Sequence, residues 1–274
     1  MLGIHRFFAL YLLLLLVYST TARATYYYES GARFSGMSNA AVAIPDLWSV
    51  SQNQAGLAYL TDVSGGIHHE RRYLVNELGM SSLALTIPHN AATIGMQLNY
   101  FGYDKYHETK AGLAVAKKFY NKFAIGVQID YFSTYTYGLQ ALNRITFESG
   151  IMADVAEDVR LGFTVFNPLP SINLNSQINE LPTLLRLGAA YTFQEKGILS
   201  AEVEHEVNYQ TILKAGLEYG LSDNFKVRTG FSTGTTQFSF GGGYCMGRLK
   251  VDMAFAMQQI LGLTPYFTVS YKLK

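Results

Sequence analysis

Apolar and polar residues alternate along most of the chain beyond residue 60. In KFAIGVQIDYF (122–132), large apolar side chains take every second position, and small or polar ones take the positions between. Because successive side chains of a β-strand point to opposite faces, this pattern predicts a strand with one apolar face. RLGFTVF (160–166), KAGLEYG (214–220) and RLKVDMAFAM (248–257) repeat it, with charge on one face only.

The alternation predicts fourteen antiparallel strands. They are expected at residues 63–73, 78–88, 91–102, 107–118, 122–133, 142–152, 157–166, 183–193, 197–207, 211–220, 224–233, 236–246, 248–257 and 264–273. Segments of about ten residues suit tilted membrane-spanning strands better than the shorter strands of a soluble sandwich. Several apolar faces also end in Tyr, as in an aromatic girdle. We therefore predict an all-β fold, a transmembrane antiparallel barrel of about 14 strands.

The links between these segments support the count. Every second link is short and turn-like (PHNA, YNK, AED, QEKG, LSDN and MGR), whereas the intervening links include all the longer ones. Outer-membrane barrels have short periplasmic turns and longer extracellular loops. An even strand number then predicts that both ends of the mature chain are periplasmic.

The N-terminus predicts export. A short basic region, the apolar run FFALYLLLLLV and Ala22-Arg23-Ala24 are typical of a secretory signal peptide over 1–24. The chain carries 21 Lys and Arg against 20 Asp and Glu, which gives no indication of a nucleic-acid partner. Its one cysteine, Cys245, excludes an internal disulfide and lies far from the cleavage site. The expected location is the bacterial outer membrane, in contact with lipid and lipopolysaccharide.

The face expected to line the lumen carries repeated glycines. They are Gly95, Gly112, Gly126, Gly150, Gly162, Gly188, Gly216 and Gly230. Glycine weakens a strand unless a bend or another backbone needs the room. These residues therefore either permit barrel curvature or make room for a segment packed inside. On the same face, symmetrical pairing would set Glu204 opposite Lys214 and Glu218 opposite Lys226, as compensated lumen charge pairs.

The segment GARFSGMSNAAVAIPDLWSVSQNQAGLAYL (31–60) is rich in small residues and precedes the first strand. We predict that residues 25–62 form a plug within a barrel of residues 63–274. The segment resembles the N-terminal hatch of the FadL and PorV/PorQ outer-membrane superfamily. The matching positions of the predicted plug are Gly31, Arg33, Gly36, Met37, Asp46, Asn53, Ala55, Gly56 and Leu57, together with Ala32, Ala41, Val42 and Ala43.

The resemblance implies two functions. A FadL-like barrel binds small hydrophobic solutes and passes them through a plugged lumen without an energy source. The alternative is a non-transporting, PorV/PorQ-like accessory subunit of an outer-membrane protein secretion (type IX-like) or assembly complex, which short outer loops and a compensated lumen favour. The chain departs from the superfamily at Gln54, where a proline is usual, and in its end, Tyr271-Lys272-Leu273-Lys274.

The loop FNPLPSINLNSQINELP (166–182) is the strongest candidate for outside contact. Its apolar residues are Leu169, Ile172, Leu174, Ile178 and Leu181. An exposed apolar loop folds over the barrel mouth as a lid, or contacts a protein partner or a ligand. These three interpretations remain open at this point.

No catalytic, metal or cofactor site is expected. Adjacent His68 and His69 point to opposite faces of a strand and cannot chelate together, and His68 and Glu70 have no evident third ligand. Arg71 and Arg72 make a membrane-edge or lipopolysaccharide contact there the better interpretation. His205 lies on the outward face with no readable serine or acid partner, so we do not expect an enzyme.

Overall fold

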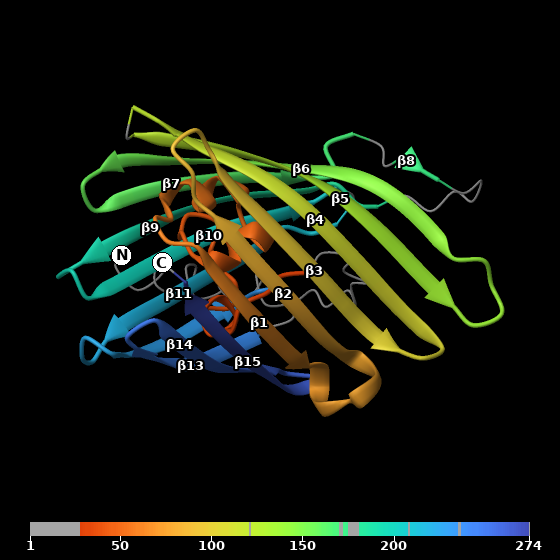
Figure 1. Cartoon of the computed structure of the whole chain (residues 1–274). Coiled ribbons are helices and arrows are strands. Elements are labelled where there is room, and N and C mark those ends of the chain that lie inside the picture. The colour runs from red at the N-terminus through yellow and green to blue at the C-terminus, as the bar shows by residue number, and fades with distance from the viewer. Residues whose placement is uncertain are drawn as a thin grey trace, which may run out of the picture.

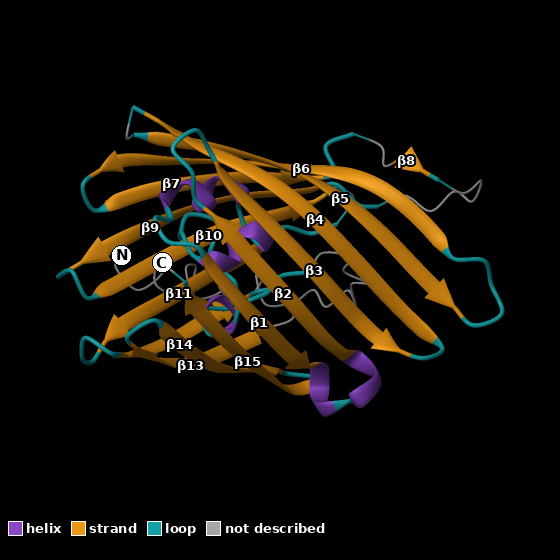
Figure 2. Ribbon diagram, in the orientation of Figure 1, coloured by secondary structure: helices purple, strands orange, loops and turns teal. Residues whose placement is uncertain are grey.

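In the computed structural model, residues 28–120, 122–169, 172–174, 181–207, 209–234 and 237–273 are described. The expected signal peptide lies outside them. Fourteen antiparallel strands form a closed barrel around the N-terminal segment (Figures 1 and 2), which confirms the predicted fold class. No helix among the described residues combines the length and the hydropathy needed to cross a membrane.

The barrel strands follow one another in the order of the sequence. They are β1 (Ser64–Arg71), β2 (Gly79–Ile87), β3 (Thr93–Tyr103), β4 (Tyr106–Phe119), β5 (Phe123–Thr136), β6 (Leu142–Ala156), β7 (Val159–Phe166), β9 (Leu184–Phe193), β10 (Gly197–Glu206), β11 (Ile212–Gly220), β12 (Phe225–Ser232), β13 (Gln237–Met246), β14 (Leu249–Gln258) and β15 (Gly262–Lys272). β1 pairs with β15, which closes the barrel. The two-residue β8 (Ile172–Asn173) lies in the β7–β9 link and pairs with β6.

The predicted strands coincide with the observed ones, with differences at their ends. The largest is in β6, which ends at Ala156 rather than 152. Large apolar side chains such as Leu113 and Val127 lie on the outer surface, 48% and 54% exposed, and their polar neighbours face the lumen. This is the inverse of a soluble sandwich and suits an apolar solvent outside the barrel.

The two ends of the barrel differ. The end that we call the turn end carries the six short links, and the first residues of β1 lie there beside the C-terminal residues, with the Leu273 amide 2.7 Å from the Val63 carbonyl. The opposite loop end carries the long β7–β9 link and the two short 3-10 helices after β1, η3 (Arg72–Leu74) and η4 (Asn76–Leu78). In Figure 1 the turn end is at the left and the loop end at the right.

The segment before β1 fills the lumen as a plug with little regular structure. It contains α2 (Ala32–Ser35), η1 (Leu47–Ser51) and η2 (Gln54–Tyr59). Asp46 accepts the Trp48 amide proton at the start of η1, and Asn53 accepts the Ala55 amide proton at the start of η2. These side chains satisfy amides that have no partner within so short a helix.

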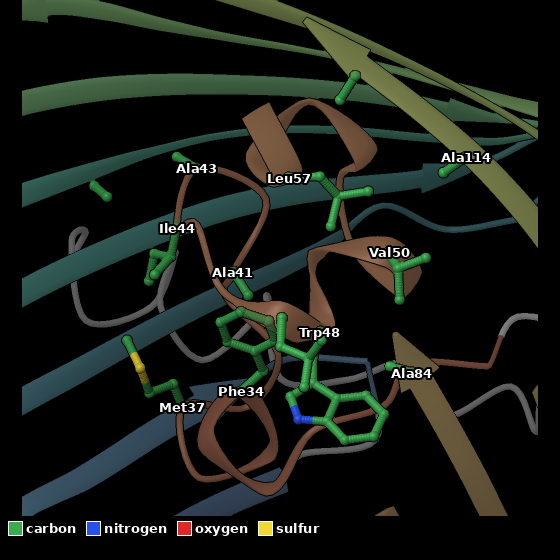
Figure 3. Close-up of a cluster of buried hydrophobic side chains, with 13 residues drawn as sticks. Phe34, Met37, Ala41, Ala43, Ile44, Trp48, Val50, Leu57, Ala84 and Ala114 are labelled. Atoms are coloured by element: carbon green, nitrogen blue, oxygen red, sulfur yellow. The ribbon is translucent and has the colours of Figure 1, made fainter. Parts of the chain in front are cut away.

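Apolar packing then fixes the plug in the barrel. A cluster that includes Phe34, Met37, Trp48, Val50 and Leu57 is buried against small wall residues (Figure 3). Each of these five side chains is at most 2% exposed. The plug therefore provides the core that a barrel of this width cannot fill with wall side chains alone.

The lumen glycines hold the plug. A Cβ at Gly126 would lie 2.4 Å from the Ala55 nitrogen, and one at Gly230 would lie 2.3 Å from the Met37 carbonyl carbon. Both distances are shorter than any real Cβ contact, so no other residue fits without displacing the plug. Seven of the eight predicted glycines contact the plug in this way; Gly112 instead makes room for wall side chains, Asp130 and Gln128. The interpretation that something packs against these glycines is confirmed.

Candidate functional site

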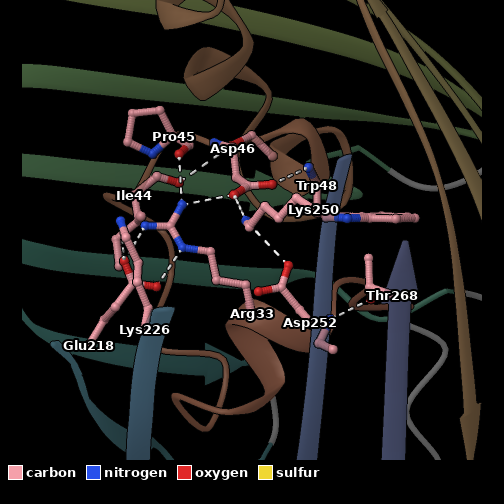
Figure 4. Close-up of polar contacts among 12 residues, drawn as sticks. Arg33, Ile44, Pro45, Asp46, Trp48, Glu218, Lys226, Lys250, Asp252 and Thr268 are labelled. Atoms are coloured by element: carbon pink, nitrogen blue, oxygen red, sulfur yellow. Dashed lines mark hydrogen bonds and ion pairs between the residues drawn. The ribbon is translucent and has the colours of Figure 1, made fainter. Parts of the chain in front are cut away.

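One group of charges, the Arg33 latch, ties the plug to β11, β12 and β14 (Figure 4). The Arg33 guanidinium donates two hydrogen bonds to Glu218, each 2.8 Å, and one of 2.8 Å to Asp46. Lys250 lies 3.1 Å from Asp46, and Arg228 lies 2.6 Å from Glu218. A planar guanidinium paired with a carboxylate in this two-bond geometry is the strongest side-chain ion pair.

Burial and pairing act in opposite directions in this latch. Burial alone would lower the pKa of Arg33 and raise the pKa of Asp46. Glu218 and Asp46 outweigh the burial of Arg33 and raise its pKa above its ordinary value. Lys250 and Arg33 hold the pKa of Asp46 well below its ordinary range. Both groups are therefore charged at neutral pH, and the latch is closed.

The predicted lumen pairs meet, but in a different register. Glu202, not Glu204, lies directly opposite Lys214, and Arg228, not Lys226, lies directly opposite Glu218. The prediction of symmetrical pairing was wrong by two residues because the centre of each hairpin is displaced by one residue from the expected position. A two-residue shift keeps a side chain on its face. The long side chains therefore still reach diagonally: Lys214 lies 2.7 Å from Glu204, and Lys226 lies 3.6 Å from Glu218.

The predicted plug residues lie together inside the barrel. Gly31 has φ 108°, and a Cβ there would lie 2.7 Å from the Trp48 ring, so this position needs glycine for both reasons. A Cβ at Gly56 would lie 2.5 Å from the Ser49 hydroxyl. The Asn53 side-chain amide donates a 2.6 Å hydrogen bond to the Val42 carbonyl, which joins two irregular segments of the plug. The remaining predicted positions, Gly36, Met37, Ala55 and Leu57, are buried.

Gln54, where the superfamily has a proline, joins the plug to the wall. Its side-chain amide nitrogen donates a 2.5 Å hydrogen bond to the carboxylate of Glu148 on β6. Glu148 also pairs with Lys110 of β4, whose ammonium lies 3.4 Å from Asp130 of β5. Lys110 and Asp130 are fully buried. At this departure from the superfamily pattern, Gln54 therefore adds a hydrogen bond to a buried charge.

The predicted loop residues do not form one surface. Leu169, Ile172 and Leu174 are exposed by 67%, 53% and 53%, whereas Leu181 is 3% exposed inside the lumen. Ile178 lies outside the described residues. The three exposed residues remain candidates for lid or partner contact, and Leu181 belongs to another group.

That group, which we call the aromatic box, lies in the loop half of the lumen. Its members are Tyr28, Met80, Phe132, Phe166, Leu181 and Leu184, with Phe101 packed against them. The Tyr28 ring comes from the plug and packs 6.2 Å from Phe101 and 6.4 Å from Phe132, between ring centroids. Lys110 lies 5.5 Å from the Phe132 centroid and 5.6 Å from the Phe166 centroid, and so bounds the box with a cation.

Sequence reasoning missed the aromatic box. A signal was present: Phe132 follows the outward Tyr131 and so shares the lumen face of β5 with Gln128 and Asp130. A large aromatic residue on an otherwise polar face marks a local apolar site.

The opposite side of the loop half is polar. Lys214 lies 2.7 Å from Glu204, 3.0 Å from Glu29 and 3.4 Å from Glu202. These three carboxylates have oxygen atoms within 4.8 Å of one another, close enough to share a metal ion. The Lys214 ammonium already lies among them and supplies the positive charge. Burial raises the pKa of Glu29 above its ordinary value, and Lys214 and Arg186, which lies 3.1 Å from Glu29, only partly offset this.

The histidines take the positions that strand alternation requires. His68 is buried in the lumen, 2.9 Å from the Thr268 hydroxyl and 3.6 Å from Glu70. His69 faces outward, 3.0 Å from Ser81. His205 also faces outward, and its ring nitrogen lies 3.2 Å from the Thr211 hydroxyl. Neither outward histidine forms a Ser-His-acid arrangement with the described residues.

A closed barrel of fourteen antiparallel strands around an N-terminal plug is a FadL-like outer-membrane channel fold. The chain is similar in structure to CymD, described as a monoaromatic hydrocarbon channel, with a TM-score of 0.69, 11% identity, and coverage of 91% of this chain and 99% of that one. It is also similar to the toluene transporter TbuX of Ralstonia pickettii (0.69, 12%, 91% and 100%) and to a FadL homologue of Pseudomonas aeruginosa (0.67, 11%, 89% and 98%).

At these identities the likeness shows the fold. The predicted resemblance to FadL is confirmed at that level, and the accessory-subunit alternative finds no support among these structures. No protein-family model and no curated protein sequence matches the chain.

Proposed function

We propose that this protein binds small hydrophobic solutes at the loop end of the barrel and passes them through the plugged lumen without an energy source. The observation that carries the proposal is the aromatic box with Tyr28 in it. The Tyr28 side chain is 1% exposed, and its hydroxyl has no hydrogen-bond partner among the described residues. The ring is thus bound through apolar contacts, while its buried hydroxyl costs about 1–3 kcal/mol.

A solute with a ring and no hydroxyl would fit the same box without that cost. Aromatic pairs add to the free energy of burial when their rings stack with an offset or meet edge to face. Phe132 and Phe166 meet edge to face at 72°, with 6.0 Å between centroids. The proteins of similar fold that are described as toluene or monoaromatic hydrocarbon channels support this choice of solute.

The proposal includes an orientation. The loop end faces the exterior and the turn end faces the periplasm, as the lengths of the links favour. Solutes then arrive past the exposed Leu169, Ile172 and Leu174, and they reach the aromatic box before the plug.

The test is uptake of a fluorescent naphthylamine probe into cells that carry the protein or its variants. Phe132→Asn places an amide in the aromatic box and is expected to reduce uptake about tenfold or more, since it removes a large buried apolar surface. Tyr137→Ala, in an exposed loop position, is the control and should leave uptake unchanged. Equal uptake by the two variants, both folded as judged by heat-modifiable migration, would exclude the box as the solute site.

The lid interpretation has its own variant. Leu169→Asp combined with Leu174→Asp should depress uptake with the barrel still folded, because charges at the entry disfavour an apolar solute. Leu139→Asp, which is 67% exposed in another loop, is the matched control. Unchanged uptake in the double variant would count against a role for this loop.

Gentle detergent extraction followed by native mass spectrometry separates transport from the accessory-subunit alternative. A solitary barrel with additional mass that extracts into organic solvent supports transport. A stoichiometric protein companion, released by the Leu169 and Leu174 changes, would instead favour the accessory subunit.

A further inference from the structure

A cavity of about 260 Å³ lies in the loop half of the lumen, on the side away from the aromatic box. Glu29, Ser38 and Asn39 of the plug form one part of its lining, and residues from β9 to β15, from the end of β1 and from η3 form the rest. We call it the polar cavity. Leu184 alone belongs to both the polar cavity and the aromatic box.

The lining of the polar cavity carries a negative charge. Three carboxylates, Glu29, Glu70 and Glu204, face two cations, Arg72 and Lys214, so the formal balance is 2 − 3 = −1. Both cations are already engaged: Arg72 lies 2.6 Å from Glu70, and Lys214 lies 2.7 Å from Glu204. Arg186, next to this group, lies 3.1 Å from Glu29 and 3.8 Å from Glu202, and with Arg186 and Glu202 both counted the formal balance is still −1. A ligand therefore meets an excess of negative charge.

Two residues of the lining carry a hydrogen-bond acceptor that is not used. The side-chain oxygens of Asn39 and Gln258 are buried and have no hydrogen-bond partner among the described residues. The amide nitrogen of Gln258 donates a 3.2 Å hydrogen bond to the side-chain oxygen of Gln237. The atom of Gln258 without a partner is therefore its side-chain oxygen. Asn39 has φ 57°, a left-handed conformation that Asn tolerates better than most residues. Buried acceptors without a partner are costly, and a ligand with N–H donors removes the cost.

We propose that the polar cavity binds a small organic cation with a primary ammonium group. Such a ligand supplies the missing positive charge and up to three N–H donors for Asn39, Gln258 and the carboxylates. A neutral alcohol supplies donors without charge, and an anion supplies neither. A bare metal ion is the poorer choice, because the carboxylates that converge most closely already surround the Lys214 ammonium.

This site goes beyond the proposed transport of hydrophobic solutes. It lies on the other side of the lumen from the aromatic box, and it selects for a charged, polar ligand instead of a hydrophobic one. Burial, with smaller contributions from Glu204 and Glu202, raises the pKa of Glu29 despite its contacts with Lys214 and Arg186, which agrees with an excess of carboxylate charge at this site. A bound ammonium would also strengthen the contact between the plug and the wall, because the cavity is lined by both.

The test is calorimetric titration of the full chain in detergent with three probes of matched shape, n-butylamine, n-butanol and butyrate. We expect n-butylamine to bind roughly tenfold more tightly than n-butanol, as one additional ion pair at partly buried depth implies, and butyrate not to bind. Equal affinity for n-butylamine and n-butanol would overturn the proposal, and so would binding of butyrate.

Variants then place the site. Glu29→Gln brings the formal balance to zero and should weaken n-butylamine binding about tenfold, whereas Glu77→Gln, an exposed carboxylate of the loop end outside the cavity, should leave it unchanged. Asn39→Gly keeps the left-handed backbone and removes one acceptor, and it serves if Glu29→Gln does not fold. Full affinity in folded Glu29→Gln or Asn39→Gly would exclude this cavity. Phe132→Asn should not alter n-butylamine affinity, so failure of one proposal is distinguishable from failure of the other.

Discussion

The two sides of the loop half differ in chemistry although one piece of the plug serves both. Tyr28 points into the aromatic box and its neighbour Glu29 points into the polar cavity. Behind Tyr28 stand lumen-facing aromatic side chains of β3, β5 and β7, and behind Glu29 stand charged and amide side chains of β10 to β15. Two neighbouring plug residues thus face two chemically different parts of the lumen.

The comparison teaches that the plug, besides filling the lumen, contributes residues to both of the proposed sites. The plug contributes Tyr28 to the aromatic box, and Glu29, Ser38 and Asn39 to the polar cavity. Movement of the plug therefore changes both sites at once, whereas a change in the wall affects only one of them.

The largest effect is expected from Arg33→Met. This change should release the plug, and with it the plug residues of both the aromatic box and the polar cavity. The change leaves the buried Glu218 with Arg228 and Lys226 only and the buried Asp46 with Lys250 only, and removing one member of a buried ion pair costs up to about 3–5 kcal/mol. Limited proteolysis of the plug in the detergent-extracted protein measures its release. Arg71→Met, at an exposed arginine, is the control and should be as resistant as the parent. A resistant Arg33→Met plug would show that the latch is dispensable.

Gly126→Val should have the next largest effect. Its Cβ would meet the plug backbone at 2.4 Å, and overpacking of a rigid interior costs about 1–3 kcal/mol. We expect higher single-channel conductance in planar bilayers, because the plug is displaced from β5. Gly65→Ala is the matched control, since its nearest neighbour lies at an ordinary 3.7 Å. Identical conductance of the two variants would contradict the role of glycine in seating the plug.

Tyr28→Phe should change binding at the aromatic box and leave binding at the polar cavity unchanged. It removes the unpartnered hydroxyl and should bind the ring in the aromatic box more firmly by about 1 kcal/mol. A solute that must replace this ring then binds about fivefold more weakly, whereas n-butylamine binding to the polar cavity is unchanged. Fluorescence titration with the naphthylamine probe measures the first effect. Tighter binding of the probe would contradict an exchange between Tyr28 and solute.

The smallest effect is expected from acidification. As pH falls, Glu29 and Asp46 should change the stability of the plug in opposite directions. The pKa of Asp46 in the folded protein is below its ordinary value of 3.8, so its contribution to stability is present above that value and is lost as pH falls below it. The pKa of Glu29 is above its ordinary value of 4.5, so its burial opposes folding at neutral pH and does so less as pH falls through the raised pKa.

Proteolysis of the plug between pH 7 and pH 3 tests both signs. Resistance should rise slightly on the way down and then fall below about pH 4. In Glu29→Gln the initial rise should disappear while the later fall remains. A rise that persists in Glu29→Gln would show that another group is responsible.

Local pattern was sufficient to predict the barrel, because a strand with one face in lipid and the other against a plug must alternate along its whole length. The lumen glycines were found for the same reason, since they occupy one face at mid-strand. Register was wrong by two residues at Lys214 and Glu218, because alternation is unchanged by a shift of two and only the loop geometry distinguishes the alternatives.

The aromatic box and the polar cavity could not be predicted because they depend on contacts between distant segments. Tyr28 precedes the recognisable hatch motif, and nothing near it in the chain indicates that it reaches Phe132. Leu181 was assigned to an exposed loop because of its neighbours, whereas the structure places it inside the lumen. Asn39 and Gln258 carry no local pattern at all.

The glycine contacts also limit how this protein can change. A wall glycine whose added Cβ would overlap the backbone of Met37 or Ala55 accepts only one path of the plug. A plug transplanted from another barrel would meet side chains where this one meets glycine, and this plug in another wall would leave voids. The plug and the wall are therefore exchangeable between proteins only as a unit, and an engineer who wishes to alter one must redesign the other with it.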